Sequence, residues 1–354
     1  MMQKPPLVTV IMPVRNESAY IARSLQAVLG QDYRADRMEI IVADGMSTDS
    51  TPAIVETFIE HHNNVKLIAN PGLVAPTGMN RAIENAKGEI IIRVDGHCEI
   101  APDYVRRCVE YLQGGEVDGV GGPLETVGET FCAQVIALAM SAPFGVGGSA
   151  FRTMRNTTML TDTVAFPAYT ASVIHRAGPY DEELVRNQDD EYNYRLRKLG
   201  ARILLAADIR CRYYSRGSMR SLWRQYFQYG YWKVRVMQKH PLQMKLRQFV
   251  PAVFVFVLIA LLLASVGFRE ARWSVLLVTG SYLIASILAT LATARRAASP
   301  GMLLLLPPAF WVMHFSYGLG FIFGLLRFWN RWHEEQPELT RAGIGATAQK
   351  ETGA

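Results

Sequence analysis

The 354-residue sequence is poor in cysteine, and a long stretch of its second half has no acidic residue. The four cysteines are too few for a disulfide scaffold and form no C-x-x-C pair, so we expect reduced thiols and no structural zinc site. The first residues carry one Lys ahead of an apolar, strand-like run, which is unlike a secretory leader. We therefore expect the N-terminal part to remain in the cytoplasm.

The acidic gap extends from Asp208 to Glu270 and divides the chain by charge. Residues 1–208 carry 26 acidic and 19 basic side chains, whereas residues 209–354 carry 5 and 18. Such a basic region suits nucleic acid or anionic lipid, and the apolar segments that follow it favour lipid. We expect anionic membrane lipid as a partner, and no nucleic acid.

Three apolar segments, at about 249–268, 273–294 and 302–326, are each long enough to cross a ~30 Å hydrocarbon core. They predict a multi-pass protein of the cell inner membrane with a cytoplasmic catalytic domain. Two features leave the topology of the third segment undecided. Pro307-Pro308 could break it into a re-entrant or interfacial piece, and the basic residues after it do not fit an odd number of crossings.

A basic segment precedes these runs and predicts a helix lying on the membrane surface. Its arginines recur every four residues, and its apolar side chains share another face. The alternative is that the apolar face packs on the catalytic domain. The residues are Arg216, Arg220 and Arg224 on one face and Met219, Leu222, Trp223, Tyr226 and Tyr229 on the other.

The N-terminal part alternates short Val- and Ile-rich runs with longer amphipathic segments, a pattern typical of βαβ units and a mainly parallel sheet. The predicted strands are at 7–12, 39–43, 65–69 and 89–94, and each is followed directly by polar residues. Ligands of such sheets bind beyond the carboxyl ends of the strands. The strand ends are therefore the candidate site.

Asp95 and His97 follow the fourth predicted strand, where a carboxylate and an imidazole could hold Mn²⁺ or Mg²⁺. An ordinary turn with a solvated histidine is the alternative. Glu17 and Asp44 follow the first two strands and could accept hydrogen bonds from a ribose or a base. For Asp44 and the residues after it, a simple turn and helix cap remain possible.

An acidic cluster at 188–191 (QDDE) provides candidates for a general base that takes a proton from a sugar hydroxyl. Three adjacent acids also suit a solvated helix start. Both interpretations stay open on the residues alone.

Four segments resemble, in order and spacing, family 2 glycosyltransferases of the GT-A fold: residues 8–17 (VTVIMPVRNE), 42–51 (VADGMSTDST), 78–80 (GMN) and 94–97 (VDGH). Residues 144–152 (FGVGGSAFR) and 185–191 (VRNQDDE) look like the succinoglycan-type exopolysaccharide branch. That branch implies transfer of glucose from a UDP-sugar onto a lipid-linked saccharide acceptor.

The resemblance also implies roles for matching positions. Pro13, Glu17 and Asp44 would line the pocket for base and ribose, and Asn80 would support the donor. Asp95 would contact donor and metal, with His97 in place of the family's second metal-binding Asp. Asp189 would be the base, with Asp190 as the alternative because Gln188 replaces the usual Glu.

The chain departs from processive members of the family, since Gln228-Tyr229 replaces their Arg-Trp pair. Two other functions stay open: a polyprenyl-phosphate glycosyltransferase, which needs little base, and a sugar nucleotidyltransferase, which would need a glycine- and lysine-rich loop that residues 13–18 lack.

The predicted organisation has four parts. They are an α/β catalytic domain of the GT-A, Rossmann-like type at 1–210, basic amphipathic interfacial helices at 211–248, a transmembrane region with about three helices at 249–330, and a polar tail at 331–354.

Overall fold

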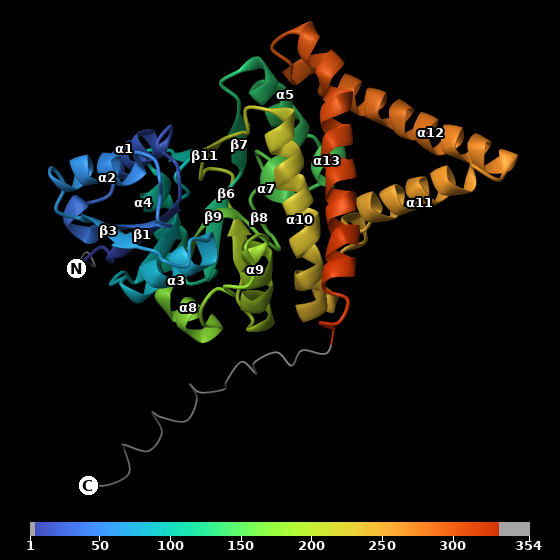
Figure 1. Ribbon diagram of the computed structural model, residues 1–354. Helices are drawn as coiled ribbons and strands as arrows, with labels where there is room; N and C mark the ends of the chain where they lie inside the picture. The colour runs from blue at the N-terminus through green and yellow to red at the C-terminus, as the bar shows by residue number, and fades with distance from the viewer. Residues whose placement is uncertain (1–3, 333–354) are drawn as a thin grey trace.

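The computed structural model describes residues 4–332, so almost all of the predicted polar tail lies outside the described residues. Figure 1 shows a sheet-containing domain, two long helices side by side (α10 and α13), and a helical hairpin (α11 and α12) that projects away from them. The cavity described below lies where the sheet domain meets the long helices.

The central sheet has eight strands in the order β3-β2-β1-β4-β9-β6-β10-β8. The strands β1 to β4 are all parallel, while β9 runs antiparallel to both of its neighbours and β8 runs antiparallel to β10. The predicted mainly parallel GT-A sheet is thus confirmed. The strands are β1 Val8–Val14, β2 Met38–Asp44, β3 Val65–Ala69, β4 Ile90–Arg93, β6 Gly119–Gly122, β8 Met159–Leu160, β9 Ala165–Thr170 and β10 Ile203–Leu205.

Both faces of this sheet are covered, which explains why its strands read as nearly continuous apolar runs. Val8, Val10 and Met12 of β1 enter one core cluster, and Ile11 enters the cluster on the opposite face. The helices of this domain are α1 Ile21–Leu29, α2 Thr51–Ile59, α3 Ala75–Glu84, α4 Tyr104–Gln113, α5 Phe131–Met140, α6 Pro143–Val146, α7 Ala150–Thr153, α8 Ala171–Ala177 and α9 Gln188–Lys198.

A second, three-stranded sheet has the order β5-β11-β7. Its strands are β5 Cys98–Ile100, β7 Leu124–Val127 and β11 Cys211–Tyr214. Because β11 pairs with both neighbours, this sheet continues past the predicted domain boundary at residue 210. The short 3₁₀ turns are η1 Ala35–Arg37, η2 Pro241–Gln243, η3 Leu246–Gln248 and η4 Ala294–Arg296.

Helix α10 (Met219–Lys239) differs from the predicted membrane-surface helix. Leu222 and Tyr226, which we expected to contact lipid, are buried in the main core cluster. Trp223 packs against Trp311 and Phe315 of α13 (Pro300–Arg327). Arg216 precedes the helix and lines the cavity, whereas Arg220 and Arg224 are exposed. The apolar face thus packs on protein, as in the alternative interpretation.

Three residues of α10 and α13 allow the two helices to approach closely. A Cβ atom at Gly230 would collide with the backbone carbonyl of Tyr317, and one at Gly320 with that of Phe227. A Cβ at Gly324 would meet the carbonyl of Tyr231. Backbone contact through glycines therefore holds this pair together.

The apolar C-terminal segments form two helices long enough to cross a membrane, at 269–296 and 300–327, instead of the three expected. Helix α11 (Val250–Ala264) has 15 residues, which at 1.5 Å per residue span about 22 Å, less than a ~30 Å core. Helix α12 (Arg269–Thr293) completes the hairpin. The Pro307-Pro308 pair does not interrupt α13.

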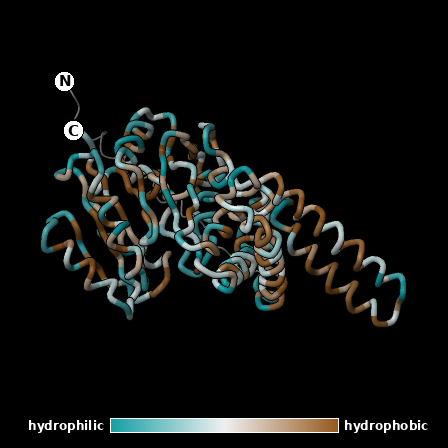
Figure 2. The backbone as a smooth tube through the Cα atoms, turned by 90° about the horizontal axis from the view of Figure 1, so that it is seen from above, coloured by the Kyte–Doolittle hydropathy of each residue, from teal (hydrophilic) through white to brown (hydrophobic). Residues whose placement is uncertain are grey.

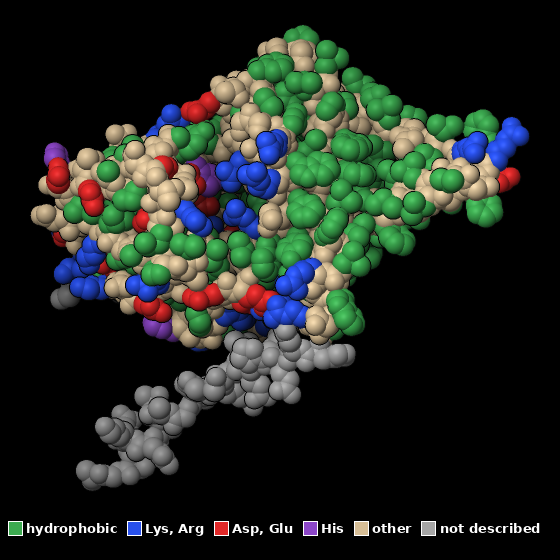
Figure 3. Space-filling model, in the orientation of Figure 1, with side chains coloured by type: hydrophobic (Ala, Val, Ile, Leu, Met, Phe, Trp, Pro, Cys, Tyr) green, Lys and Arg blue, Asp and Glu red, His purple; other side chains and the backbone are tan. Residues whose placement is uncertain are grey.

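The hairpin surface is apolar along its length and hydrophilic at its tip, where Arg269, Glu270 and Arg272 lie (Figure 2). Figure 3 shows a continuous hydrophobic surface over the hairpin and the long helices. Side chains such as Leu277, Ile284 and Leu291 are more than half exposed, so this surface has no protein cover within the described residues.

Candidate active site

A cavity of about 700 Å³ lies between the sheet domain and helices α10 to α13. Its volume is within the usual range for a ligand site. On the face shown in Figure 3, a hollow between the two parts of the molecule is bordered by Lys and Arg side chains. Asp95, His97, Asp189 and Asp190 all line the cavity, so the structure brings the predicted metal and base candidates together.

Arg93, the last residue of β4, joins two of these carboxylates. Its Nε donates to Asp95 Oδ1 at 2.8 Å and its Nη2 to Asp95 Oδ2 at 3.2 Å, while its Nη1 donates to Asp189 Oδ1. The guanidinium is nearly buried. One cation therefore fixes the strand-end carboxylate and the carboxylate on α9 relative to each other.

His97 lies in a turn between β4 and β5. Its Nδ1 is 2.9 Å from Glu17 Oε1, and its ring packs edge-on against Tyr213. With Nδ1 donating to Glu17, Nε2 keeps its lone pair, and no described residue hydrogen-bonds to it. A carboxylate behind an imidazole is the usual support for a metal-binding histidine.

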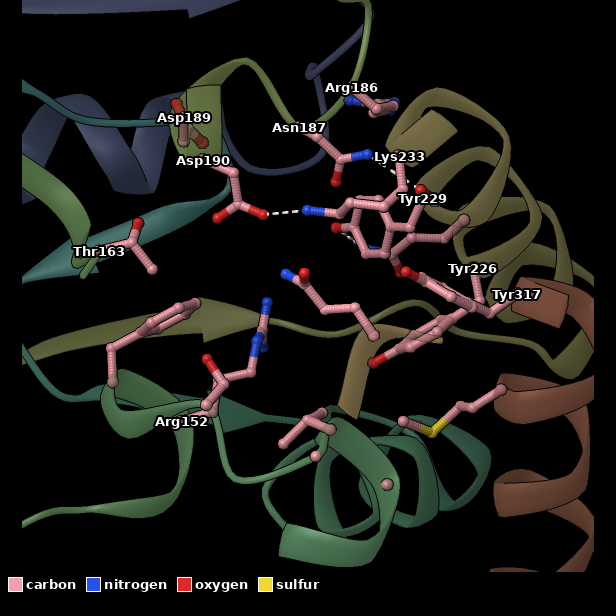
Figure 4. Close-up of a pocket in the computed structure, with 18 of the residues that line it drawn as sticks. Arg152, Thr163, Arg186, Asn187, Asp189, Asp190, Tyr226, Tyr229, Lys233 and Tyr317 are labelled. Carbon is pink, nitrogen blue, oxygen red and sulfur yellow. Dashed lines mark hydrogen bonds and ion pairs between the residues drawn. The ribbon is translucent and has the colours of Figure 1, made fainter. Parts of the chain in front are cut away.

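The acidic cluster divides into two kinds of residue. Glu191 is buried and forms an ion pair with Arg195, with His240 Nε2 3.1 Å away, so it connects α9 to the end of α10. Asp189 and Asp190 instead line the cavity, and Figure 4 shows the Asp190 carboxylate directed towards Lys233. Asp190 pairs with Lys233 of α10. The first two acids are therefore available for chemistry, while the third is structural.

Asp189 lies in the first turn of α9, and 39% of its side chain remains accessible from the cavity. The surrounding protein removes most bulk water, and this desolvation raises the pKa of Asp189 although Arg93 opposes the shift. No described residue hydrogen-bonds to Oδ2. A carboxylate with a raised pKa and a free oxygen has the properties of a general base.

The remaining predicted residues lie outside the cavity lining. Pro13 is in β1, and Asp44 ends β2, directly beside Val14 in the register. Asp44 Oδ2 accepts from the Ser47 N–H at 2.9 Å, whereas its buried Oδ1 has no partner among the described residues. Asn80 is bonded to Tyr180 and Glu182 in the interior, which connects α3 to residues 180–182.

Several cavity residues were not predicted as site residues: Arg93, Arg152, Arg216 and Lys233. Arg93 stands two positions before Asp95, and this spacing was a usable signal. Arg152 was assigned only to the segment that resembles the succinoglycan-type branch, and Arg216 and Lys233 only to the basic region before the apolar segments. Sequence could not show that they face the same cavity as Asp189.

A mixed sheet of this order with carboxylates at its strand ends is the arrangement of a GT-A glycosyltransferase. The model of the family described as glycosyl transferase family 2 matches residues 9–177. The chain belongs to this family and is a nucleotide-sugar-dependent glycosyltransferase of glycan biosynthesis.

Two relatives extend the similarity beyond the matched segment. The succinoglycan biosynthesis protein ExoA of Rhizobium meliloti is 30% identical over 267 residues, which cover 73% of this chain and 78% of that protein. The dolichyl N-acetyl-alpha-D-glucosaminyl phosphate 3-beta-D-2,3-diacetamido-2,3-dideoxy-beta-D-glucuronosyltransferase of Methanococcus voltae is 25% identical over 328 residues, covering 90% of this chain and 97% of that one.

Solved structures support the fold. The mannosyltransferase PcManGT from Pyrobaculum calidifontis, in complex with GDP-Man and Mn²⁺, superposes with a TM-score of 0.57 at 18% identity, covering 92% of this chain and 88% of that chain. S. aureus TarS 1-349 gives a TM-score of 0.51 at 17% identity and covers 91% of each chain. At this identity the likeness establishes the GT-A fold.

Proposed function

We propose that the protein transfers one sugar, glucose, from a UDP-sugar to a lipid-linked saccharide acceptor, with inversion at the anomeric carbon. The observation that carries the proposal is the bridge Asp95–Arg93–Asp189, which holds a strand-end carboxylate and a candidate base at one cavity. In an inverting transfer the acceptor attacks from the face opposite the nucleotide, so base and diphosphate must flank the sugar.

The carboxyl ends of β1 and β2 would bind the nucleotide. Asp44 Oδ1 is a buried acceptor with no partner in the described part of the chain, which suits a ribose hydroxyl or a base N–H. Glu17 and Pro13 lie at the neighbouring strand end. Asn80 is the exception among the residues predicted to bind the nucleotide-sugar donor, because its side-chain amide hydrogen-bonds to other residues of the protein. Its support of the donor would be indirect, through residues 180–182.

The donor set of Asp95 and His97 fits a divalent cation, Mn²⁺ or Mg²⁺. Each Asp95 oxygen keeps a lone pair beside its bond from Arg93, and the Glu17 contact leaves His97 Nε2 available. Within the described residues no group of three or more His, Cys, Asp or Glu side chains could hold a metal alone. Such sites take their other ligands from phosphate and water. The metal would neutralise charge on the departing UDP.

Asp189 would accept the proton of the acceptor hydroxyl at Oδ2 as that hydroxyl attacks. Arg93 keeps the carboxylate oriented through Oδ1 and prevents it from turning towards the diphosphate. We favour Asp189 over Asp190 because Asp189 is linked to Asp95 through one side chain, whereas Asp190 is paired with Lys233 of α10.

A lipid-linked acceptor agrees with the name of the Methanococcus relative and with the apolar hairpin next to the cavity. The basic residues Lys245, Arg247, Arg295 and Arg296 flank the two ends of the hairpin, which under the positive-inside rule would lie on the cytoplasmic side.

The test uses the purified full chain with Mn²⁺, a panel of radiolabelled UDP-sugars and bacterial lipid extract. Asp189→Asn should lower transfer from UDP-glucose by about 10²–10⁴-fold, since general-base catalysis contributes that much, while Mn²⁺-dependent UDP binding is retained. Asp190→Asn is the matched control and should retain more activity. Full activity of Asp189→Asn would instead favour an acceptor phosphate that needs no base, and failure of every UDP-sugar would refute the donor class.

A further inference from the structure

Three buried polar atoms in the cavity wall have no hydrogen-bond partner among the described residues: Arg152 Nη1, Gln225 Oε1 and Gln243 Oε1. All three residues line the cavity. Buried polar atoms are almost always bonded, so unpaired ones that face a cavity indicate a ligand position. Only the Arg152 atom is a donor, since the other two are amide oxygens, and none of the three belongs to the site assigned above.

Arg152 is also a cation without a carboxylate. Two other cationic side chains of the cavity differ from it, since Arg93 pairs with Asp95 and Asp189, and Lys233 pairs with Asp190. No described carboxylate pairs with Arg152. Its guanidinium carbon instead lies 5.2 Å from the ring centre of Phe151 and 5.9 Å from that of Tyr213. An unpaired guanidinium of this kind suits a phosphate.

Figure 4 shows the direction of this side chain. Arg152 extends from α7 into the cavity, towards the side on which Asp190 and Lys233 lie, and Tyr226, Tyr229 and Tyr317 line the wall made by α10 and α13. The guanidinium therefore faces the part of the cavity that Asp190 and Lys233 line.

The glycine-rich motif 144–152 explains the placement of Arg152. Gly147 and Gly148 both have positive φ, at +62° and +70°, which reverses the chain between α6 and α7. Their carbonyls each accept from Arg247 Nη1 at 2.9 Å. Arg247 directly precedes α11, so the loop that presents Arg152 is joined to the base of the apolar hairpin.

The other end of the cavity is apolar and belongs to the helices. Its wall contains Phe144 of α6, Phe254 of α11, Tyr282 of α12 and Met313 of α13. Phe144 is held there because His314 Nε2 is 2.9 Å from its carbonyl and the two rings pack edge to face. A single cavity thus continues from Asp95 to a wall on the membrane-type helices.

We propose that Arg152 binds a phosphate of the lipid-linked acceptor, and that the apolar wall at Phe254 and Tyr282 holds the first part of its hydrocarbon chain. This rests on the proposed function and assigns the acceptor its own subsite, separate from the donor diphosphate at Asp95 and His97. The Tyr213 ring contacts both His97 and Arg152. The proposed positions of the donor diphosphate and of the acceptor phosphate therefore lie on either side of this ring.

The probe is geranyl phosphate, titrated by tryptophan fluorescence into the full chain in neutral detergent. Arg152→Gln should weaken its binding at least about tenfold, because a hydrogen bond to a charged group is lost. Arg212→Gln, an exposed arginine outside the cavity, is the matched control and should bind as the wild type does. Phe254→Ala should also weaken binding, by a smaller factor.

Geraniol, inorganic phosphate and phosphatidylglycerol separate the possible sources of the phosphate. The proposal requires that each binds much more weakly than geranyl phosphate and that Arg152→Gln keeps its affinity for UDP with Mn²⁺. Equal binding of inorganic phosphate or of phosphatidylglycerol would overturn it, as would loss of UDP binding, which would place Arg152 in the donor site. A wild-type chain that fails to bind UDP would refute the proposed function instead, whatever geranyl phosphate does.

Discussion

Helices α12 and α13 belong to apolar segments of the same length, 28 residues each, but they have different surroundings. Only 11% of the most apolar stretch of the first is buried inside the protein, against 44% for the second. Helix α13 packs along α10 through glycines, while α12 presents its leucines outward. Length and hydropathy alone therefore do not distinguish a helix that needs lipid from one that needs a protein partner.

The largest expected effect concerns the α10–α13 contact. Gly320→Val would push a side chain into the backbone carbonyl of Phe227, and neither backbone can move without separating the helices. We expect a loss of more than about 3 kcal/mol in the free energy of unfolding. The control is Gly280→Val on α12, where an added Cβ meets no atom within 4 Å. Thermal unfolding in detergent compares the two, and equal losses would show that both helices are packed alike.

A charge in the hairpin is the second test. Ile284→Lys lies near the middle of α12, and its side chain is 61% exposed. A lysine at the centre of a membrane helix raises the free energy of membrane insertion by about 3 kcal/mol. We therefore expect much less of the protein to remain in the membrane fraction after alkaline extraction, while UDP binding is preserved. If Ile284→Lys changes UDP binding and leaves extraction unaffected, α12 does not contact lipid.

Acidification should loosen the α10–α13 pair from the catalytic domain. Burial alone would raise the pKa of Glu183, but hydrogen bonds from Arg235 and Lys239 of α10 lower it to about 2. A lowered pKa means that the stabilisation is complete above the unfolded value of 4.5 and is lost as the pH falls from there towards 2. After allowance for solvent screening, the expected loss in the free energy of unfolding is about 2 kcal/mol.

Denaturant unfolding between pH 6 and pH 2.5 measures this loss. Glu183→Gln should be less stable at pH 6 and should lose less stability on acidification than the wild type. If the free energy of unfolding falls with pH equally steeply in the wild type and in Glu183→Gln, the ion pairs of Glu183 do not stabilise the packing of α10 on the catalytic domain.

The smallest effect concerns the exposed arginines of α10. Replacing Arg220 and Arg224 by Gln should weaken binding to anionic liposomes by about 1 kcal/mol per residue at low salt, and less in 0.15 M salt. The apolar face beneath them is packed on α13, so only electrostatic attraction is removed. Flotation with neutral and anionic vesicles measures this binding. If the variant also binds neutral vesicles less well than the wild type does, Trp223 or Phe227 enters the lipid.

The sequence predicted the sheet and its strand-end carboxylates because parallel strands have a strong apolar pattern and end in polar residues. It also predicted that Asp95, His97 and Asp189 would belong to one site. It did not predict the partner of α10, since an apolar face has the same pattern whether lipid or a helix covers it. The pairing of Lys233 with Asp190 was equally hidden, because the two residues are 43 positions apart and meet only after α10 packs on α9.

The Asp95–Arg93–Asp189 bridge also has a consequence for charge balance during the reaction. If Asp189 is the base, as we propose, the three side chains sum to −1 while both carboxylates are ionised and to zero once the acceptor's proton is on Asp189. That neutralisation coincides with the growth of negative charge on the leaving diphosphate. The repulsion between the base and the leaving group thus decreases during the step in which it would otherwise be greatest. Once Asp189 has become neutral, the charge of Arg93 interacts more strongly with Asp95.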